Sequence, residues 1–173
     1  MRGLPPLLAC LLLAVPGGAP GAERDLAPLE AALHREVNAL RRRAGRVPLL
    51  RDPALDAVAR AHSRDMARRG YLAHVDPEGR SPLDRLREAG ISGFTLAAEN
   101  AGRSDRRDAV VEIVRGWVAS PTHHRNLFLP AFNRTGIGVA RGPEGAIYAT
   151  QLYVTVPRAG RASPAPPGAA PGP

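Results

Sequence analysis

The stretch TGIGVARGPEGAIYATQLYVTV, residues 135–156, decides the fold class. Residues 135–141 and 146–156 contain the β-branched and aromatic side chains that favour strands, and the turn-forming sequence Gly-Pro-Glu-Gly at 142–145 separates them. Two such segments joined by a short turn predict a β-hairpin. We expect one further short strand, at residues 96–101.

Helices are predicted to precede this hairpin. Apolar residues at helical spacing, together with capping signals, indicate four helices at about 26–43, 52–70, 81–90 and 105–119. Asp52 is predicted to cap the second helix, and Ser81 with Asp84 to form a capping box at the start of the third. Because proline disfavours helical geometry in the residue before it, Pro121 ends the fourth helix, and Ser120 is predicted to be the N-cap of a fifth.

The order of these elements indicates the fold class. Helices first and a strand pair last, without alternation of single strands and helices, predict an α+β domain layered on an antiparallel sheet. The domain is expected to span residues 27–157, a length that suits one hydrophobic core.

The two ends of the chain are expected to lie outside this domain. Residues 1–22 have the features of a secretory signal peptide, with a positive charge at Arg2, an apolar stretch at 7–15 and small residues at 17–22. The alternative is lipidation at Cys10, but the apolar run continues past that cysteine. Residues 158–173 are mostly Pro, Gly and Ala, which predicts a disordered tail. We therefore expect a protein that is secreted, periplasmic or held at the cell surface.

The position of the single cysteine and the lengths of the apolar runs argue against a disulfide-bonded domain and against a membrane-spanning one. Cys10 lies in the leader, so the domain is expected to form no disulfide and no thiolate metal site. No segment after the leader has the roughly 20 apolar residues that a membrane-spanning helix needs.

The chain is strongly basic. It has 24 basic residues, all of them arginine, against 16 acidic ones, and its formal net charge of +8 falls to +7 without the leader. This charge predicts attraction to anionic surfaces. The arginines are scattered through helical segments and are not interleaved with aromatic residues, so a solvated face is favoured over a specific nucleic-acid partner.

Two of the five histidines, His74 and His123, lie at junctions between helix and loop, where a scaffold positions side chains without burying them. Glu99 and Asn100 are likewise expected where a scaffold positions side chains without burying them. A helix N-terminus lowers the pKa of a nearby histidine, so His123 is expected to stay neutral near pH 7. The pattern alone leaves open whether these residues share one site.

The remaining histidines are interpreted differently. His62 shares a stripe with apolar residues of the second helix, which predicts a hydrogen-bonded core residue. His34 has no polar neighbours that suggest a ligand, and His124 is expected to face solvent. The chain also lacks an H-E-x-x-H metal motif, a G-x-S-x-G nucleophile elbow and a phosphate-binding glycine loop.

Residues 29–156 resemble the CAP superfamily of cysteine-rich secretory proteins, antigen 5 and plant pathogenesis-related proteins, and in particular its short bacterial (SCP-like extracellular) branch. The residues that carry the resemblance follow one another in the family's order: Asn38, Arg42, Gly45, Pro48-Leu49, Leu55, Ala61-His62-Ser63, Asp65-Met66-Ala67, Gly70-Tyr71, His74, Asp84-Arg85-Leu86, Gly90, Glu99-Asn100, Trp117, Ser120-Pro121-Thr122-His123, Asn126-Leu127, Phe132, Gly136-Ile137-Gly138-Val139 and Gln151.

The resemblance implies a three-layer α-β-α sandwich with a small antiparallel sheet, and a cleft. In many eukaryotic members this cleft has two histidines and two glutamates that can bind a divalent metal. Here His74 and His123 match the histidines and Glu99 the first glutamate, whereas Ser120 occupies the position of the second. The implied metal ligands are His74, His123 and Glu99, and weakly bound zinc, with water completing its shell, is the cofactor expected.

Three functions follow from these interpretations. The leading one is a secreted, non-enzymatic and monomeric binding module, whose cleft of His74, Glu99, His123, Ser120 and Asn100 holds a divalent metal or a small ligand. The first alternative is an extracellular, protease-like hydrolase with His123 or Glu99 as general base and Ser120 or a metal-bound water as nucleophile. The second is a basic surface module for anionic envelope polymers or lipids. The expected partners are thus a small ligand, a lipid or a cell-envelope component.

Overall fold

The computed structural model describes residues 26–157, so the predicted signal peptide and tail lie outside the described residues. The elements are, in order, α2 (Ala27–Arg43), β1 (Leu50–Arg51), α3 (Pro53–Arg69), α4 (Pro82–Glu88), β2 (Leu96–Ser104), α5 (Ala109–Ala119), α6 (Pro121–Phe128), β3 (Arg134–Arg141), a 3₁₀ turn (Pro143–Gly145) and β4 (Ile147–Thr155). The predicted α+β class is confirmed, and the hairpin is β3 and β4.

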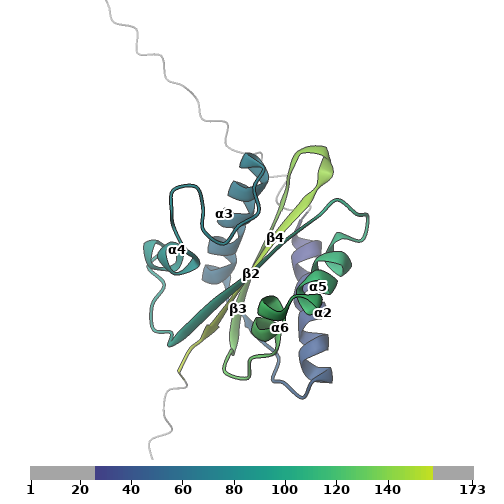
Figure 1. Ribbon diagram of the computed structural model, residues 1–173. Coiled ribbons are helices and arrows are strands. Elements are labelled where there is room, and N and C mark those ends of the chain that lie inside the picture. The colour runs from purple at the N-terminus through teal and green to yellow at the C-terminus, as the bar shows by residue number, and fades with distance from the viewer. Residues whose placement is uncertain (1–25, 158–173) are drawn as a thin grey trace, which may run out of the picture.

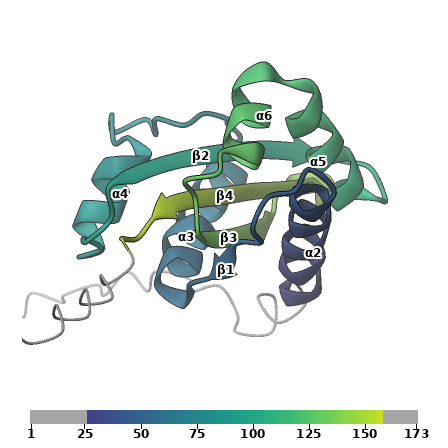
Figure 2. The same ribbon diagram turned by 90° about the horizontal axis from the view of Figure 1, so that it is seen from below.

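A four-stranded sheet lies between two layers of helices (Figures 1 and 2). Helices α3 and α4 cover one face, and α2, α5 and α6 cover the other. Alternate residues of β4 point to the two layers, so Ala149 and Tyr153 pack with α2 and α5, while Leu152 and Val154 pack with α3 and α4. The three-layer arrangement expected from the resemblance is therefore present.

The sheet is mixed, which corrects the prediction of an antiparallel one. Its strand order is β1-β3-β4-β2, and β1 pairs with β3 in parallel, whereas the other pairings are antiparallel. The pattern missed β1 because a strand of two residues is too short to show any periodicity.

Local signals fixed most helix ends. The side chain of Asp52 accepts hydrogen bonds from the backbone of Ala54 and Leu55, and Ser81 and Asp84 form the predicted capping box. One start was predicted wrongly: helix α5 begins at Ala109 instead of residue 105, because residues 105–108 form a turn after β2. Ser120 is the N-cap of α6, as predicted, although its side chain makes no capping hydrogen bond.

Two glycines let α3 lie close against the sheet. A Cβ atom at Gly138 would overlap the backbone of Ala59 and Arg60, and one at Gly136 would overlap Leu55. The carbonyl of Gly138 in turn accepts a 2.9 Å hydrogen bond from the Ser63 hydroxyl. The Gly-x-Gly spacing therefore sets the distance between helix and sheet on the α3 side.

The outer side of β3 is hydrogen-bonded to side chains instead of a strand along most of its length, because β1 pairs only with Arg134 and Thr135. The backbone N–H of Ile137 donates to Asp56 at 2.7 Å, and that of Val139 donates to Glu30 at 3.3 Å. Arg51 donates to both carboxylates, at 3.0 and 2.7 Å. Two carboxylates and one guanidinium thus satisfy this part of the strand.

Helix α6 is attached to the end of α2 by a buried arginine. The Arg41 side chain is fully buried and donates to the carbonyls of Val47, Leu127, Leu129 and Phe132. Burial lowers its pKa, with opposing and smaller effects from neighbouring side chains. The position of α6, and of the residues it carries, therefore depends in part on one side chain of the neighbouring helix α2.

Candidate functional site

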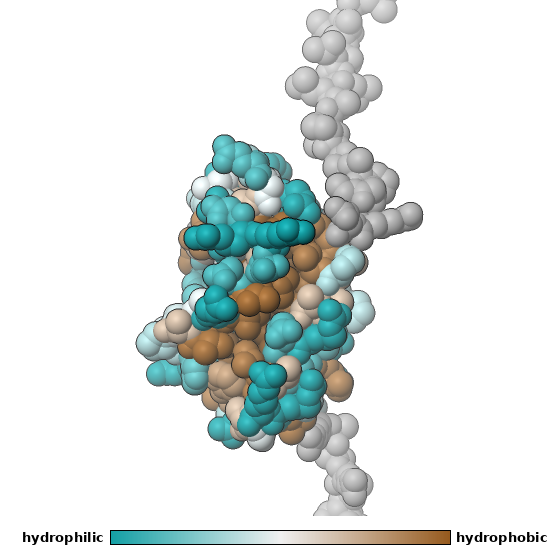
Figure 3. Space-filling model, turned by 90° about the vertical axis from the view of Figure 1, so that its right-hand side faces the viewer, coloured by the Kyte–Doolittle hydropathy of each residue, from teal (hydrophilic) through white to brown (hydrophobic). Residues whose placement is uncertain are grey.

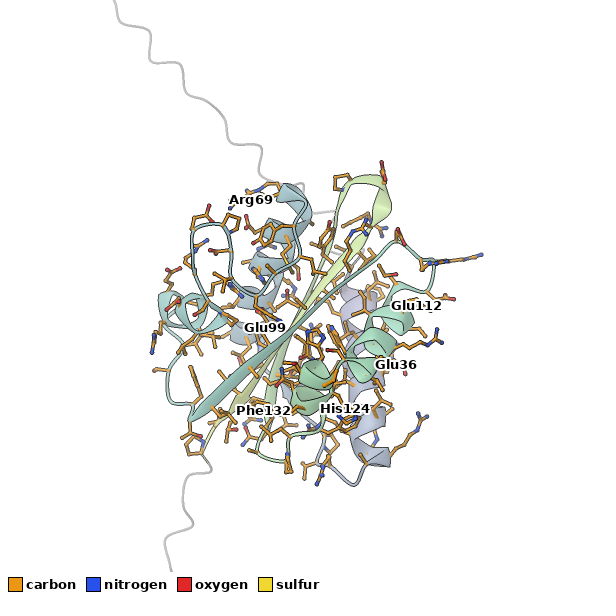
Figure 4. All side chains as sticks on the ribbon, in the orientation of Figure 1. Glu36, Arg69, Glu99, Glu112, His124 and Phe132 are labelled. Atoms are coloured by element: carbon orange, nitrogen blue, oxygen red, sulfur yellow. The ribbon has the colours of Figure 1, made fainter. Side chains whose placement is uncertain are left out.

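Two of the predicted site residues are in direct contact, and a third lies beside them. His74 lies on the loop between α3 and α4, and His123 lies on α6. Glu99 lies near the middle of β2 (Figure 4). Nδ1 of His74 is 2.9 Å from Oε1 of Glu99, and the rings of His74 and His123 are 5.8 Å apart between centroids. The His74 side chain is 45% exposed, whereas that of Glu99 is 1% exposed. Glu99 therefore orients His74 from below while leaving the imidazole accessible.

Arg85 completes this cluster, although the sequence analysis gave it no role. Its Nη2 donates to Oε2 of Glu99 at 2.7 Å, and its Nη1 donates to the carbonyls of His74 and Arg80. One guanidinium thus neutralises the buried carboxylate and holds the backbone of the His74 loop. The only signal in the sequence was the resemblance at Asp84-Arg85-Leu86, which does not say what Arg85 contacts.

His62 is the predicted core histidine and also a neighbour of this cluster. It is 2% exposed, its Nε2 lies 2.9 Å from the carbonyl of Ala73, and the same nitrogen is 3.8 Å from Glu99. Burial lowers the pKa of His62, against the raising effect of the Glu99 charge. A neutral His62 therefore supports the loop that carries His74.

Asn100 lies beneath α6. It is fully buried, and its side-chain amide donates to the backbone carbonyl of His123 and to the Tyr153 hydroxyl, while its oxygen accepts from Asn126. Asn126 also donates to the carbonyl of Glu99, at 3.2 Å. Asn100 was predicted to line the cleft, and in the structure its polar atoms position α6 instead.

The remaining predicted residues fall outside the contact between His74 and Glu99. Ser120 is partly buried, and no side-chain hydrogen bond joins its hydroxyl to a described residue. His124 is exposed, as expected, and packs on Phe128. His34 was predicted to have no polar neighbours that suggest a ligand, and its Nε2 lies 2.9 Å from the Asn38 amide and 3.0 Å from the carbonyl of Leu49.

The residues at this cleft do not fit a divalent metal. Both oxygens of Glu99 are engaged, one by Arg85 and one by His74, and the adjacent guanidinium opposes a second positive charge. Ser120 supplies no carboxylate where the family's second glutamate would lie. Within residues 26–157, no group of three His, Cys, Asp or Glu side chains is arranged to hold a metal ion. Two imidazoles alone fall short of the three protein ligands typical of catalytic zinc.

The two imidazoles differ in their affinity for a proton. The hydrogen bond to Glu99 raises the pKa of His74, against a smaller lowering effect of burial. Burial lowers the pKa of His123, and the nearby His74 lowers it further. The direction for His123 is the one expected from the sequence, but its cause is burial instead of the helix N-terminus. The cleft therefore combines a histidine that charges readily with one that stays neutral.

A groove with a volume of about 1300 Å³ runs beside α3 and α4. Its lining includes His62, Asp76 and Arg85 but neither His74 nor His123. The histidine pair therefore lies outside this groove, although His62 and Arg85, which support the His74 loop, contribute to its lining.

The raised pKa of His74 leads to a testable pH dependence. A group whose folded-state pKa is raised contributes stability below its unfolded pKa, and this contribution is lost as pH rises through the folded pKa. Urea unfolding of the wild type and of His74→Gln should therefore differ more at about pH 5 than at about pH 8. The exposed His124→Gln is the matched control, and a difference that grows with pH would contradict the assignment.

Comparison with known proteins agrees with this architecture. Residues 34–153 match the cysteine-rich secretory protein family, CAP. The uncharacterized protein YkwD of Bacillus subtilis is 34% identical over 116 residues, which are 67% of this chain and 43% of that protein. An extracellular SCP-domain protein of Bacillus anthracis superposes with a TM-score of 0.69 at 27% identity, over 78% of this chain and 43% of that one. An outer surface protein of Borrelia burgdorferi gives the same TM-score at 19% identity, covering 77% and 96%.

The α-β-α layers and the histidine cleft at the edge of the sheet define an SCP-like domain. The chain belongs to the CAP, or cysteine-rich secretory protein, family. It spans less than half the length of the Bacillus subtilis relative. None of the helices in residues 26–157 has the length and hydrophobicity that crossing a bilayer requires.

Proposed function

We propose that this protein is a non-enzymatic binding module that works outside the cell, and that its cleft holds a small anionic ligand between His74 and His123 without a metal. The observation that carries the proposal is the state of the two imidazoles. Only Nδ1 of His74 has a hydrogen-bond partner among the described residues, which leaves three ring nitrogens for a ligand. A protonated His74 supplies positive charge and one donor, Nε2, and neutral His123 supplies one donor and one acceptor.

The surroundings of the cleft support an anion. The carboxylate of Glu99 is neutralised by Arg85, so protonation of His74 leaves a net positive charge at the surface. Leu72 and Val75, which flank His74, are each 51% exposed. An anionic group that also has a short apolar part would therefore contact both the imidazoles and this rim.

The location outside the cell is supported by the predicted signal peptide and by two similar structures, whose names describe an extracellular protein and an outer surface protein. The hydrolase alternative is less well supported. A carboxylate that orients an imidazole is a common arrangement around a general base. However, no described hydrogen bond links the Ser120 hydroxyl to either histidine, and Glu99 is already ion-paired.

The test is a titration of metal-free domain with acetate and with inorganic phosphate, followed by NMR of the histidine rings. The His74 and His123 signals should shift together, more strongly at acidic pH, and His74→Ala should abolish the effect on His123. His124→Ala is the control, because that imidazole is exposed on the same helix as His123. Unmoved His74 and His123 signals would overturn the proposal, as would stoichiometric zinc binding that depends on His74 or turnover of peptide or ester substrates.

A further inference from the structure

The arginines of this protein are neutralised on one side of the molecule and not on another. Seven of them make ion pairs with carboxylates on α2, α3, α4, β2 and the loop between α3 and α4: Arg51, Arg60, Arg68, Arg69, Arg80, Arg85 and Arg87. In the other layer, Arg115 on α5 pairs with Glu112. The positive charge around α3 and α4 is therefore largely balanced.

The carboxyl end of α2 has no such balance. Arg42, Arg43 and Arg46 are exposed and make no ion pair with a described residue, and Arg125 on α6 is in the same state. Arg41 joins the two helix ends, because its guanidinium bonds to the carbonyls of Leu127 and Leu129 just after Arg125. We refer to Arg42, Arg43, Arg46 and Arg125 as the basic end.

Helix α2 ends at the bottom of the molecule in Figure 1, and it contacts α6. Figure 3 shows hydrophilic residues at both the upper and the lower end of this side, with a more apolar region between them. The exposed acidic residue of α2 is Glu36, in the middle of the helix and apart from this cluster. Arg42, Arg43 and Arg46 thus lie at one end of α2 without an ion-pair partner among the described residues, and Arg125 lies on the neighbouring helix α6.

Helix capping accounts for only part of this arrangement. Positive charge in the last turn of a helix is favourable, and that explains Arg42 and Arg43 on α2 and Arg125 on α6 when each is taken singly. Arg46 lies beyond the end of α2, and several like charges in one region repel each other in the free protein. A partner that supplies negative charge to all four side chains would remove this repulsion.

We propose that the basic end binds a linear polyanion whose repeating acidic groups are phosphates. Guanidinium groups bind phosphate through two parallel hydrogen bonds, and arginine stays charged at any physiological pH. Three arginines at and just beyond the end of α2, and one on α6, require several phosphates in sequence, which a polymer provides and a single ion does not. The proposal goes beyond the function assigned to the cleft, because none of these side chains contacts His74 or Glu99.

The test measures the affinity for inorganic polyphosphate of uniform length at about 50 and 200 mM salt. The wild type should bind more weakly at the higher salt, because each phosphate contact releases bound counter-ions. The triple variant Arg42→Gln, Arg43→Gln, Arg46→Gln should bind at least about tenfold more weakly at low salt, with a salt slope smaller by about 2.

A matched variant tests whether binding depends on the basic end or only on the total charge of the protein. Arg68, Arg87 and Arg115 have exposed side chains, at 76, 66 and 70%, and each pairs with a carboxylate. Their triple replacement by Gln removes the same charge and should leave the affinity within about twofold. Equal loss in both variants overturns the proposal. So does binding that is insensitive to salt, or binding only to vesicles of anionic lipid. His74→Ala should leave polyphosphate binding unchanged, so this test and the test of the cleft fail independently.

Discussion

Replacing Arg85 with methionine is expected to lower the free energy of unfolding by about 3 to 5 kcal/mol, because it leaves the carboxylate of Glu99 buried without a partner. That carboxylate is 1% exposed, and the guanidinium that neutralises it is 8% exposed. The same change frees the backbone carbonyls of His74 and Arg80. Urea denaturation of the two proteins measures the difference.

Two further measurements test whether the loss of stability comes from the buried ion pair between Arg85 and Glu99. Arg87→Met, on the same helix but 66% exposed, should cost less than about 1 kcal/mol. NMR titration should also show a higher pKa for His74 in Arg85→Met, because the positive charge of Arg85 lowers that pKa in the wild type. Equal, small losses of stability in the two variants would mean that the pair is not needed to stabilise the buried carboxylate.

Replacing Arg41 with methionine is expected to have an effect of similar size, about 3 to 5 kcal/mol, for a different reason. Arg41 faces four backbone carbonyls, and methionine would leave all of them without a donor in a buried region. Arg41→Lys should recover only part of the loss of stability, because an ammonium group lacks the planar, forked set of donors with which the guanidinium bonds to four carbonyls.

This prediction has a control on α2 and a second readout on α6. Arg43→Met, at an exposed position on α2, should change stability by less than about 0.5 kcal/mol. Because Arg41 holds the end of α6, Arg41→Met should also increase hydrogen exchange of α6 and change the ring signals of His123. Unchanged exchange in α6 would show that other contacts are sufficient to hold this helix.

Signals that act within a few residues predicted most of the fold. The caps of α3 and α4 could be predicted because Asp52, Ser81 and Asp84 bond to backbone groups only two or three residues away. The start of α5 could not, because residues 105–108 form a turn whose place is set by the pairing of β2 with β4 as far as Ser104. The pairing of β1 with β3 joins residues more than 80 positions apart and has no local signature.

The contrast between signals in the local sequence and contacts between distant segments also applies to the residues around His74. His74, Glu99 and His123 were identified from the resemblance to the family, and the structure brings His74 into contact with Glu99 and beside His123. The role of Arg85 could not be inferred, since an arginine on an amphipathic helix is usually a solvated residue. The burial of Asn100 likewise depends on α6 folding over β2. Contacts between distant segments decide which polar side chains face a ligand and which support it.

The carboxylates of Glu30 and Asp56 have a consequence for association between molecules. They occupy the N–H groups of Ile137 and Val139 that an incoming strand from another copy would need. An unoccupied sheet edge is a template for aggregation, and charged residues that block it are a common defence. Through Glu30, helix α2 therefore also protects the domain from association with other chains. A fragment beginning after residue 30 would expose part of a sheet edge to which another strand could add.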